Sequence, residues 1–173
     1  MPHHVFLTGA KRVGKSTVLR KVLSGYPGNI GGFFTVRTDG VFPGKFTVHL
    51  CPAGENAAPD TDNLLFVCRE ADRSAAERFD RLGCKALGDR AGCSLLVMDE
   101  IGPTEAEAAR FRRAVLDCLD GDTPVLGVLQ APADRFWPEV VSHPSVLVLE
   151  ITEENRDDPA LTAAIISTLK KTR

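Results

Sequence analysis

The sequence predicts an α/β fold, with one mostly parallel central sheet flanked by helices and an antiparallel hairpin at the edge of that sheet. Three observations support this prediction. Strand-like and helix-like segments alternate along the chain, which is the order that right-handed crossovers produce. Residues 94–98 and 125–129 are largely apolar without alternation, as strands covered on both faces are. A glycine-rich turn at residues 9–17 separates the first strand from the first helix.

Composition and charge narrow the class of protein. The chain has 173 residues, of which 43% are hydrophobic and 25% charged, so we expect a single domain covering residues 1–173 with a sizeable core. The formal net charge of -2 offers no basic surface for nucleic acid or for an anionic membrane. No apolar run is long enough to span a bilayer. We therefore expect no nucleic-acid partner and no membrane attachment.

The cysteines indicate a reducing compartment. Five of them are scattered along the chain, an odd number without a C-x-x-C pair, which argues against a disulfide framework and against a zinc site. The first strand follows directly after residues 1–4, so we expect no signal peptide. Together these features predict a cytoplasmic protein with reduced cysteines.

The first half of the chain contains four expected strands and two expected helices. Alternation and turn residues favour an antiparallel hairpin for the second and third strands, with turns at 38–40 and 42–44. Residues 52–63 lack apolar periodicity and form either a lid over a ligand or a surface loop; the absence of Lys and Arg favours the surface loop. The strands are expected at residues 5–8, 30–36, 45–50 and 64–68, and the helices at 16–23 and 72–89.

The second half alternates in the same way. We expect Asp99 and Glu100 to end the strand that begins at residue 94, and Thr104 to cap the next helix. Trp137 is expected to pack in the core, and Asp158 to cap the last helix with Pro159 at its first position. The strands are expected at residues 94–98, 125–129 and 146–151, and the helices after residue 104, at 134–141 and after residue 158.

The turn between the first strand and the first helix reads G-x-x-x-x-G-K-S, the phosphate-binding P-loop pattern. Two glycines allow backbone conformations that a Cβ would block, so that successive N–H groups can surround an anion at the positive end of the helix. The alternative is a turn that only caps the helix. The predicted nucleotide-binding residues are Gly9, Ala10, Lys11, Arg12, Val13, Gly14, Lys15, Ser16 and Thr17.

Two side chains of this loop have expected chemical roles. Lys15 can reach the β- and γ-phosphates, which makes it a predicted catalytic residue as well as a binding one. The Ser16 hydroxyl is a predicted ligand of Mg²⁺, an ion that keeps most of its waters and takes few protein ligands. The motif and its context predict a P-loop NTPase fold.

Asp99 and Glu100 follow an apolar strand, which is the pattern of a Walker B segment. We expect Asp99 to hold Mg²⁺ opposite Ser16, and Glu100 to polarise a water for in-line attack on the γ-phosphate. The alternative is a pair of exposed acids leading into a helix. An acid directly after the Walker B Asp is typical of hydrolytic ATPases that have an additional strand between the P-loop strand and the Walker B strand.

Charge that develops on the β–γ bridging oxygen calls for a further cation. Four arginines are candidates for this cation, and their positions in the sequence do not by themselves favour one of them. These are Arg12, Arg37, Arg135 and Arg156.

Several stretches together resemble the THEP1-type nucleoside-triphosphatases, which are small P-loop proteins related to RecA-like ATPases. Besides the P-loop, residues 31–37 resemble that family's glycine-phenylalanine-x-threonine strand ending in Arg, and residues 152–157 resemble its N-R-D stretch. Residues 99–102, with Glu105 and Phe111 following, resemble its D-E-I-G-x-x-E…F segment. The middle of the chain, residues 52–90, departs from the family, as do residues 103–104.

The resemblance implies slow Mg²⁺-dependent hydrolysis of ATP, GTP and other nucleoside triphosphates to the diphosphate and phosphate, with broad tolerance of the base. It favours Arg37 and Arg156 as the catalytic cation, because both sit in the matching stretches. Asn155 and Arg156 are also predicted to contact the base or ribose, because they precede the last helix, near where P-loop folds commonly place the base. A nucleotide or small-molecule kinase and a nucleotide-gated regulatory binding module remain the alternatives. The sequence predicts no particular base, pathway, oligomeric state or protein partner.

Overall fold

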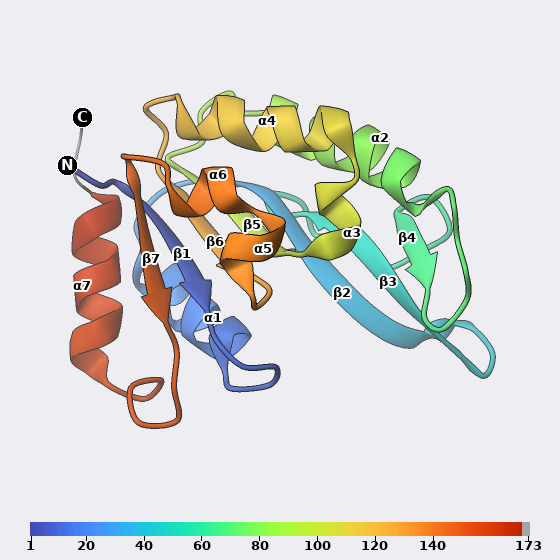
Figure 1. Ribbon diagram of the computed structural model, residues 1–173, viewed down its shortest axis with the longest axis horizontal. Coiled ribbons are helices and arrows are strands. Elements are labelled where there is room, and N and C mark those ends of the chain that lie inside the picture. Colours follow the sequence, from blue (N-terminus) through green and yellow to red (C-terminus); the bar gives the residue numbers. More distant parts are fainter. Residues whose placement is uncertain (171–173) are drawn as a thin grey trace.

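A seven-stranded sheet forms the centre of the computed structural model, which describes residues 1–170 (Figure 1). Five neighbouring strands are parallel, and β3 and β4 add antiparallel pairs beyond β2. In spatial order the strands are β4 (Leu64–Val67), β3 (Lys45–Pro52), β2 (Ile30–Phe42), β5 (Leu95–Ile101), β6 (Val125–Leu129), β1 (His4–Thr8) and β7 (Val146–Glu150).

Helices cover both faces of the sheet (Figure 1). The first and last helices pack on one face, and the others, short pieces included, lie on the opposite face. Within residues 1–170 no helix is long and apolar enough to cross a membrane. The helices are α1 (Lys15–Gly25), α2 (Ala75–Gly88), α3 (Pro103–Ala106), α4 (Ala109–Leu119), α5 (Ala133–Phe136), α6 (Pro138–Val141) and α7 (Pro159–Leu169).

The burial of the central strands explains their lack of alternation. In β1, Val5 and Leu7 point to the core beneath α1 and α7, whereas Phe6 points to the core beneath the other helices. All three side chains are fully buried. Because both faces of these strands are covered by helices, a polar side chain at either position would lose its water. The predicted mostly parallel sheet flanked by helices is confirmed.

The predicted hairpin of β2 and β3 is confirmed, with two corrections. The outermost strand is β4, so β2 lies inside the sheet, between β3 and β5. Residues 38–40 were expected to turn, but β2 continues through them to Phe42 because its pairing with β3 resumes after an irregularity between Thr38 and Phe42. The reversal itself occurs at residues 43–44, where Gly44 adopts a φ of 72°.

The prediction that Asp99 and Glu100 end their strand is wrong. β5 continues to Ile101, because Gln130 donates its backbone N–H to the Ile101 carbonyl at 2.9 Å. The strand accommodates Glu100 through a φ of 46° and a register irregularity between Met98 and Ile101. This is a local bulge, which re-aims side chains without ending the strand.

Two helix predictions also need correction. Gly102 rather than Thr104 is the N-cap, because Pro103 occupies the first helical position and the Glu105 carboxylate accepts the Gly102 N–H at 3.0 Å. The helix expected at 134–141 is divided into α5 and α6 at Trp137, whose side chain is buried as expected. Pro138 begins the second piece, since proline lacks the N–H that would continue the first.

The loop at residues 52–63 behaves as a surface loop. It begins where Pro52 pairs with Phe33, at the amino-terminal edge of the parallel strands, opposite the edge that carries the P-loop. Asn63 anchors its end: its Oδ1 accepts from His49 Nδ1 at 2.8 Å and its amide donates to the Ala58 carbonyl at 2.8 Å. This position does not support a lid over phosphates.

Candidate functional site

The P-loop connects the carboxyl end of β1 to α1, and its glycines are required by the backbone. Gly9 has a φ of 137° and Gly14 a φ of 115°, conformations that L side chains rarely adopt. A Cβ on Gly9 would lie 2.5 Å from the Ile151 carbonyl oxygen. Gly14 is also the N-cap of α1 and has no side chain to occupy the first N–H groups of that helix. These donors therefore remain available to an anion.

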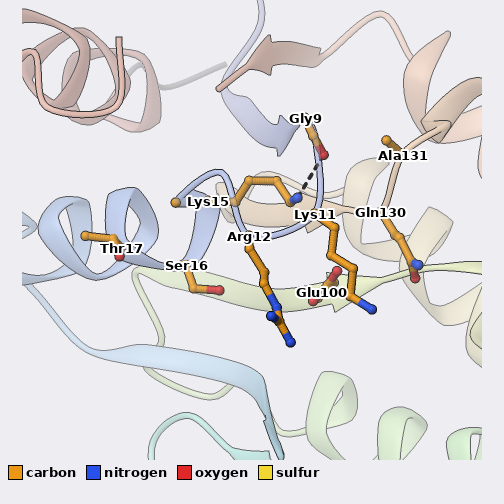
Figure 2. A pocket seen from close by; sticks show the side chains of 10 residues that line it. Gly9, Lys11, Arg12, Lys15, Ser16, Thr17, Glu100, Gln130 and Ala131 are labelled. Atoms are coloured by element: carbon orange, nitrogen blue, oxygen red, sulfur yellow. Dashed lines mark hydrogen bonds between the residues drawn. The ribbon is translucent and has the colours of Figure 1, made fainter. Parts of the chain in front are cut away.

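Lys15 rests on its own loop. Its Nζ donates to the Gly9 carbonyl at 2.8 Å (Figure 2) and to the Ala10 carbonyl at 2.9 Å. Only 8% of the residue is exposed. Burial lowers the pKa of the ammonium group, and the negative charge of Glu100 partly opposes that effect.

A cavity of about 400 Å³ opens in front of the loop (Figure 2). It lies at the carboxyl edge of the parallel strands, where open α/β sheets commonly bind ligands. The structure thus brings Glu100 together with most of the predicted P-loop residues. The lining consists of Gly9, Lys11, Arg12, Gly14, Lys15, Ser16, Thr17, Glu100, Gln130 and Ala131.

Asp99 lies next to this lining and is 7% exposed. Burial, with a smaller contribution from the charge of Glu100, raises the pKa of its carboxyl group to about 6, and the charge of Arg20 opposes both effects. Within residues 1–170 the Asp99 carboxylate forms no hydrogen bond or ion pair. A buried acid without a protein partner fits a position beside a cation.

The donor set is compatible with magnesium. Ser16 offers a hydroxyl at the cavity and Asp99 a carboxylate beside it, and both are the hard oxygen donors that Mg²⁺ prefers. In the described part of the chain no three His, Cys, Asp or Glu side chains are grouped as a metal site. Mg²⁺ does not require such a cage, because it usually retains several waters and binds substrate phosphates.

The other predicted site residues lie outside the cavity lining. Arg37 is exposed on β2, with its guanidinium carbon 4.7 Å from the centre of the Phe46 ring. The Ala10 carbonyl supports Lys15 and the Val13 carbonyl faces Arg156, so these two loop residues shape the loop without lining the cavity.

Asn155 and Arg156 lie in the turn between β7 and α7. Arg156 Nη1 donates to the Val13 carbonyl at 3.1 Å, which fixes this turn against the outside of the P-loop. Asn155 accepts from the Thr152 N–H and donates to the Glu150 carbonyl, each at 2.9 Å. Its side chain therefore holds the turn together in the structure.

Gln130 and its neighbour Ala131 line the cavity and were missed by the sequence analysis, and Gln130 is the polar one of the two. It directly follows β6, which lies between the P-loop strand β1 and the strand β5 that carries Asp99. This order confirms the additional strand that the acid pair predicts. A polar residue at the carboxyl end of that strand was the available signal, because such a residue must emerge between the two motifs.

Comparisons with known proteins agree with this geometry. Residues 4–166 match the family model described as NTPase. The chain is 31% identical to Nucleoside-triphosphatase THEP1 of Thermotoga petrophila, covering 98% of this chain and 94% of that one. It is 32% identical to the protein of the same name from Methanosarcina acetivorans, over 89% and 90% of the two chains.

Among solved structures, THEP1 from Aquifex aeolicus superposes with a TM-score of 0.68 at 22% identity, covering 97% of this chain and 99% of that one. At this identity the likeness concerns the fold, and it agrees with the arrangement of sheet and helices described above. The family model covers nearly the whole chain, and the sequence identities extend over almost all of it as well. The chain therefore belongs to the NTPase family, as the resemblance of its motifs predicted.

Proposed function

We propose that this protein hydrolyses nucleoside triphosphates to the diphosphate and phosphate with the help of Mg²⁺. One observation carries the proposal: a single cavity joins a complete P-loop to the carboxylate of Glu100 at the carboxyl edge of the sheet. The P-loop can hold the polyphosphate, and the carboxylate can orient a water. The names of the relatives agree with this reaction.

Phosphate binding falls to the loop backbone and Lys15. The first residues of α1, Lys15, Ser16 and Thr17, line the cavity, where the helix dipole favours negative charge. Lys15 can exchange the carbonyls of Gly9 and Ala10 for phosphate oxygens. Ser16 and Asp99 would hold Mg²⁺, which when bound would neutralise charge on the β- and γ-phosphate oxygens.

Glu100 is placed to act on water. Its bulged backbone, with a φ of 46°, brings the side chain to the cavity although Asp99 before it is buried. A carboxylate within reach of a water can orient that water toward the γ-phosphorus. Catalysis of phosphoryl transfer depends mostly on such positioning and on electrostatic stabilisation.

Broad tolerance of the base follows from the same lining. None of the ten residues that line the cavity is aromatic, so the cavity itself offers no stacking surface for a base. We propose that recognition is concentrated on the phosphates of ATP, GTP and other triphosphates. Asn155 and Arg156 remain our proposal for contacts with the base or ribose, because the Arg156 side chain lies beside Gly14 at the start of α1.

A cytoplasmic location is also proposed. All five cysteines are free in the structure, which suits a reducing compartment. The five are Cys51, Cys68, Cys84, Cys93 and Cys118.

The decisive experiment compares two substitutions in purified protein. Lys15→Ala should reduce affinity for a non-hydrolysable triphosphate by at least about tenfold, because it removes the ammonium that meets the phosphates. Glu100→Gln should keep that affinity and reduce kcat about 100-fold or more, since an amide orients water poorly. Calorimetry measures the affinity, and phosphate release measures the rate.

Arg113→Ala is the matched control, because Arg113 is exposed on α4 and pairs with Asp117 away from the cavity. It should leave both quantities unchanged. If the parental protein consumes no triphosphate unless an acceptor is added, and then transfers the γ-phosphoryl group to that acceptor, the protein is a kinase and our proposal is wrong. The position of the 52–63 loop already disfavours that alternative, because the loop does not cover the cavity.

A further inference from the structure

Two residues other than glycine combine a left-handed backbone with a place in the cavity lining. Arg12 has a φ of 63° and Glu100 a φ of 46°. A third residue other than glycine with a positive φ in the described chain, Arg69, follows β4 and does not line the cavity. Backbone strain of this kind persists where the surrounding structure enforces it, and it concentrates at active sites. The strain at Arg12 therefore calls for a reason connected with the cavity.

The Arg12 side chain also has no interaction partner within residues 1–170. It is exposed, and in this described part of the chain it forms no hydrogen bond, ion pair or ring contact. Figure 2 shows it extending from the crest of the P-loop on the same side as Glu100. The other arginines that the sequence suggested have contacts elsewhere. The guanidinium groups of Arg37 and Arg135 lie over the rings of Phe46 and Phe136. Arg156 donates a hydrogen bond to the Val13 carbonyl.

The position of Arg12 along the loop places it among the groups that would surround the polyphosphate. It lies between Gly9 and Gly14, whose neighbouring N–H groups surround the polyphosphate in the proposed function. A left-handed backbone sets the direction in which the side chain leaves the loop, toward the cavity that Glu100 also lines. A guanidinium presents several donors in a planar fork, so it can bind two phosphate oxygens at once, whereas Lys15 acts as a point charge.

We infer that Arg12 is a catalytic residue that supplies, from within the same chain, the cation for the β–γ bridging oxygen and the γ-phosphate oxygens. This inference rests on the proposed function. In the reaction, a water oxygen bonds to the γ-phosphorus while the bond from that phosphorus to the bridging oxygen breaks. The electron pair stays on the diphosphate, one proton of the water remains on the released phosphate and the other passes to solvent. Arg12 stabilises the charge that grows on the bridging oxygen.

Arg12→Gly is the sharpest test, because glycine tolerates the left-handed backbone and the substitution removes only the side chain. We expect kcat to fall about 100- to 1000-fold, in the range measured when one oxyanion-hole donor is removed. Affinity for the diphosphate should change less than about threefold. Arg12→Lys should restore part of the rate, because it returns the positive charge without the planar fork. Arg113→Ala is the control for loss of a surface arginine.

A second readout does not depend on turnover. The diphosphate with aluminium fluoride imitates the transferring phosphoryl group, and its affinity should fall at least about tenfold in Arg12→Gly, tracking the loss of kcat. A parental rate in Arg12→Gly, or equal losses of affinity for diphosphate, triphosphate and the fluoride complex, overturns the role of Arg12. Absence of hydrolysis in the parental protein, in contrast, refutes the proposed function itself.

Discussion

Glu105 is an acid buried beside the cavity region without being part of its lining. It is 8% exposed, and one carboxylate oxygen accepts the Gly102 N–H at 3.0 Å, which caps α3. Burial raises the pKa of its carboxyl group to about 7; backbone hydrogen bonds oppose this effect and the charge of Glu100 adds to it. The capping bond survives protonation, because the neutral carboxyl still has an oxygen that can accept.

This pKa predicts how stability depends on pH. Between pH 4.5, the ordinary pKa of a glutamate in the unfolded chain, and the folded pKa of about 7, the folded state holds a proton that the unfolded state has released. Raising the pH through this window therefore lowers the free energy of unfolding, by about 2–4 kcal/mol from Glu105 alone. Below pH 4.5 this contribution is fully present, and above pH 7 it is lost.

Glu105→Gln should remove this dependence while keeping the cap. The amide oxygen can accept the Gly102 N–H, so the variant imitates the protonated acid at every pH. The difference in unfolding free energy between parent and variant, measured by urea unfolding from about pH 4.5 to about pH 8, isolates Glu105 because Asp99 is present in both. A difference that stays constant across this range would show that Glu105 does not titrate there.

Single residues also show which parts of the site the sequence could predict. The P-loop was predictable because G-x-x-x-x-G-K-S fixes both the backbone and the chemistry, and its lining residues appear in the cavity. Arg37 was favoured by resemblance alone, and its stacking on Phe46 depends on pairing between two strands that no local pattern encodes. Gln130 reaches the cavity only because of the order of the strands.

At the scale of elements, the contact between α2 and α4 depends on a glycine. Gly83 faces Phe111, and a Cβ at this position would lie 2.3 Å from a carbon of the Phe111 ring. Phe111 is fully buried and packs against Phe33, Phe79 and Trp137, so the ring has little room to retreat. The close approach of the two helices therefore requires the missing side chain.

Gly83→Ala should destabilise the protein although alanine favours a helix. Helix propensity contributes about 1 kcal/mol in favour of alanine. Overpacking against a rigid ring costs about 1–3 kcal/mol. We expect a net loss of up to about 2 kcal/mol in urea unfolding. Gly88→Ala is the matched control, because nothing lies within 4 Å of a Cβ there, and it should be neutral or stabilising. A stabilised Gly83→Ala variant would contradict the packing argument.

The elements themselves were largely predictable, and their irregularities were not. Apolar runs identified the central strands, and alternation of polar and apolar residues identified the strand at residues 45–50. The bulge at Glu100 has no local signature, because a polar pair after a strand reads equally as its end. Gly102 replaced Thr104 as the cap because the side chain of Glu105 supplies the missing acceptor, a choice that depends on its burial.

For the molecule as a whole, the order of the strands determines where the P-loop and the two acids Asp99 and Glu100 lie relative to each other. Inserting β6 between β1 and β5 separates the P-loop from Asp99 and Glu100 by one strand and leaves room for the cavity between them. The alternation of strands and helices predicted the layers. The strand β4 was predicted, but its place at the edge of the sheet was not, because that place depends on its pairing with β3.

Ligand binding should stabilise this whole assembly. At a concentration about 100 times its Kd, a non-hydrolysable triphosphate with Mg²⁺ contributes about 2.7 kcal/mol to the folded state. For a chain of this size we expect Tm to rise by about 5–10 °C. Chelating the metal with EDTA should remove most of the shift, and Lys15→Ala should reduce it by about half or more. Equal shifts with and without metal would show that Mg²⁺ is not needed for binding.

Because the ammonium of Lys15 already rests on two carbonyl oxygens of its own loop, it has lost most of its hydration shell before any substrate arrives. A lysine on an open surface would have to shed that water at the moment of capture. Here the incoming polyanion only replaces two neutral acceptors with charged ones, and the chain need not fold around it. We therefore expect triphosphate binding to exchange the two loop carbonyls at Lys15 for phosphate oxygens, with a rate limited by diffusion of the triphosphate into the cavity.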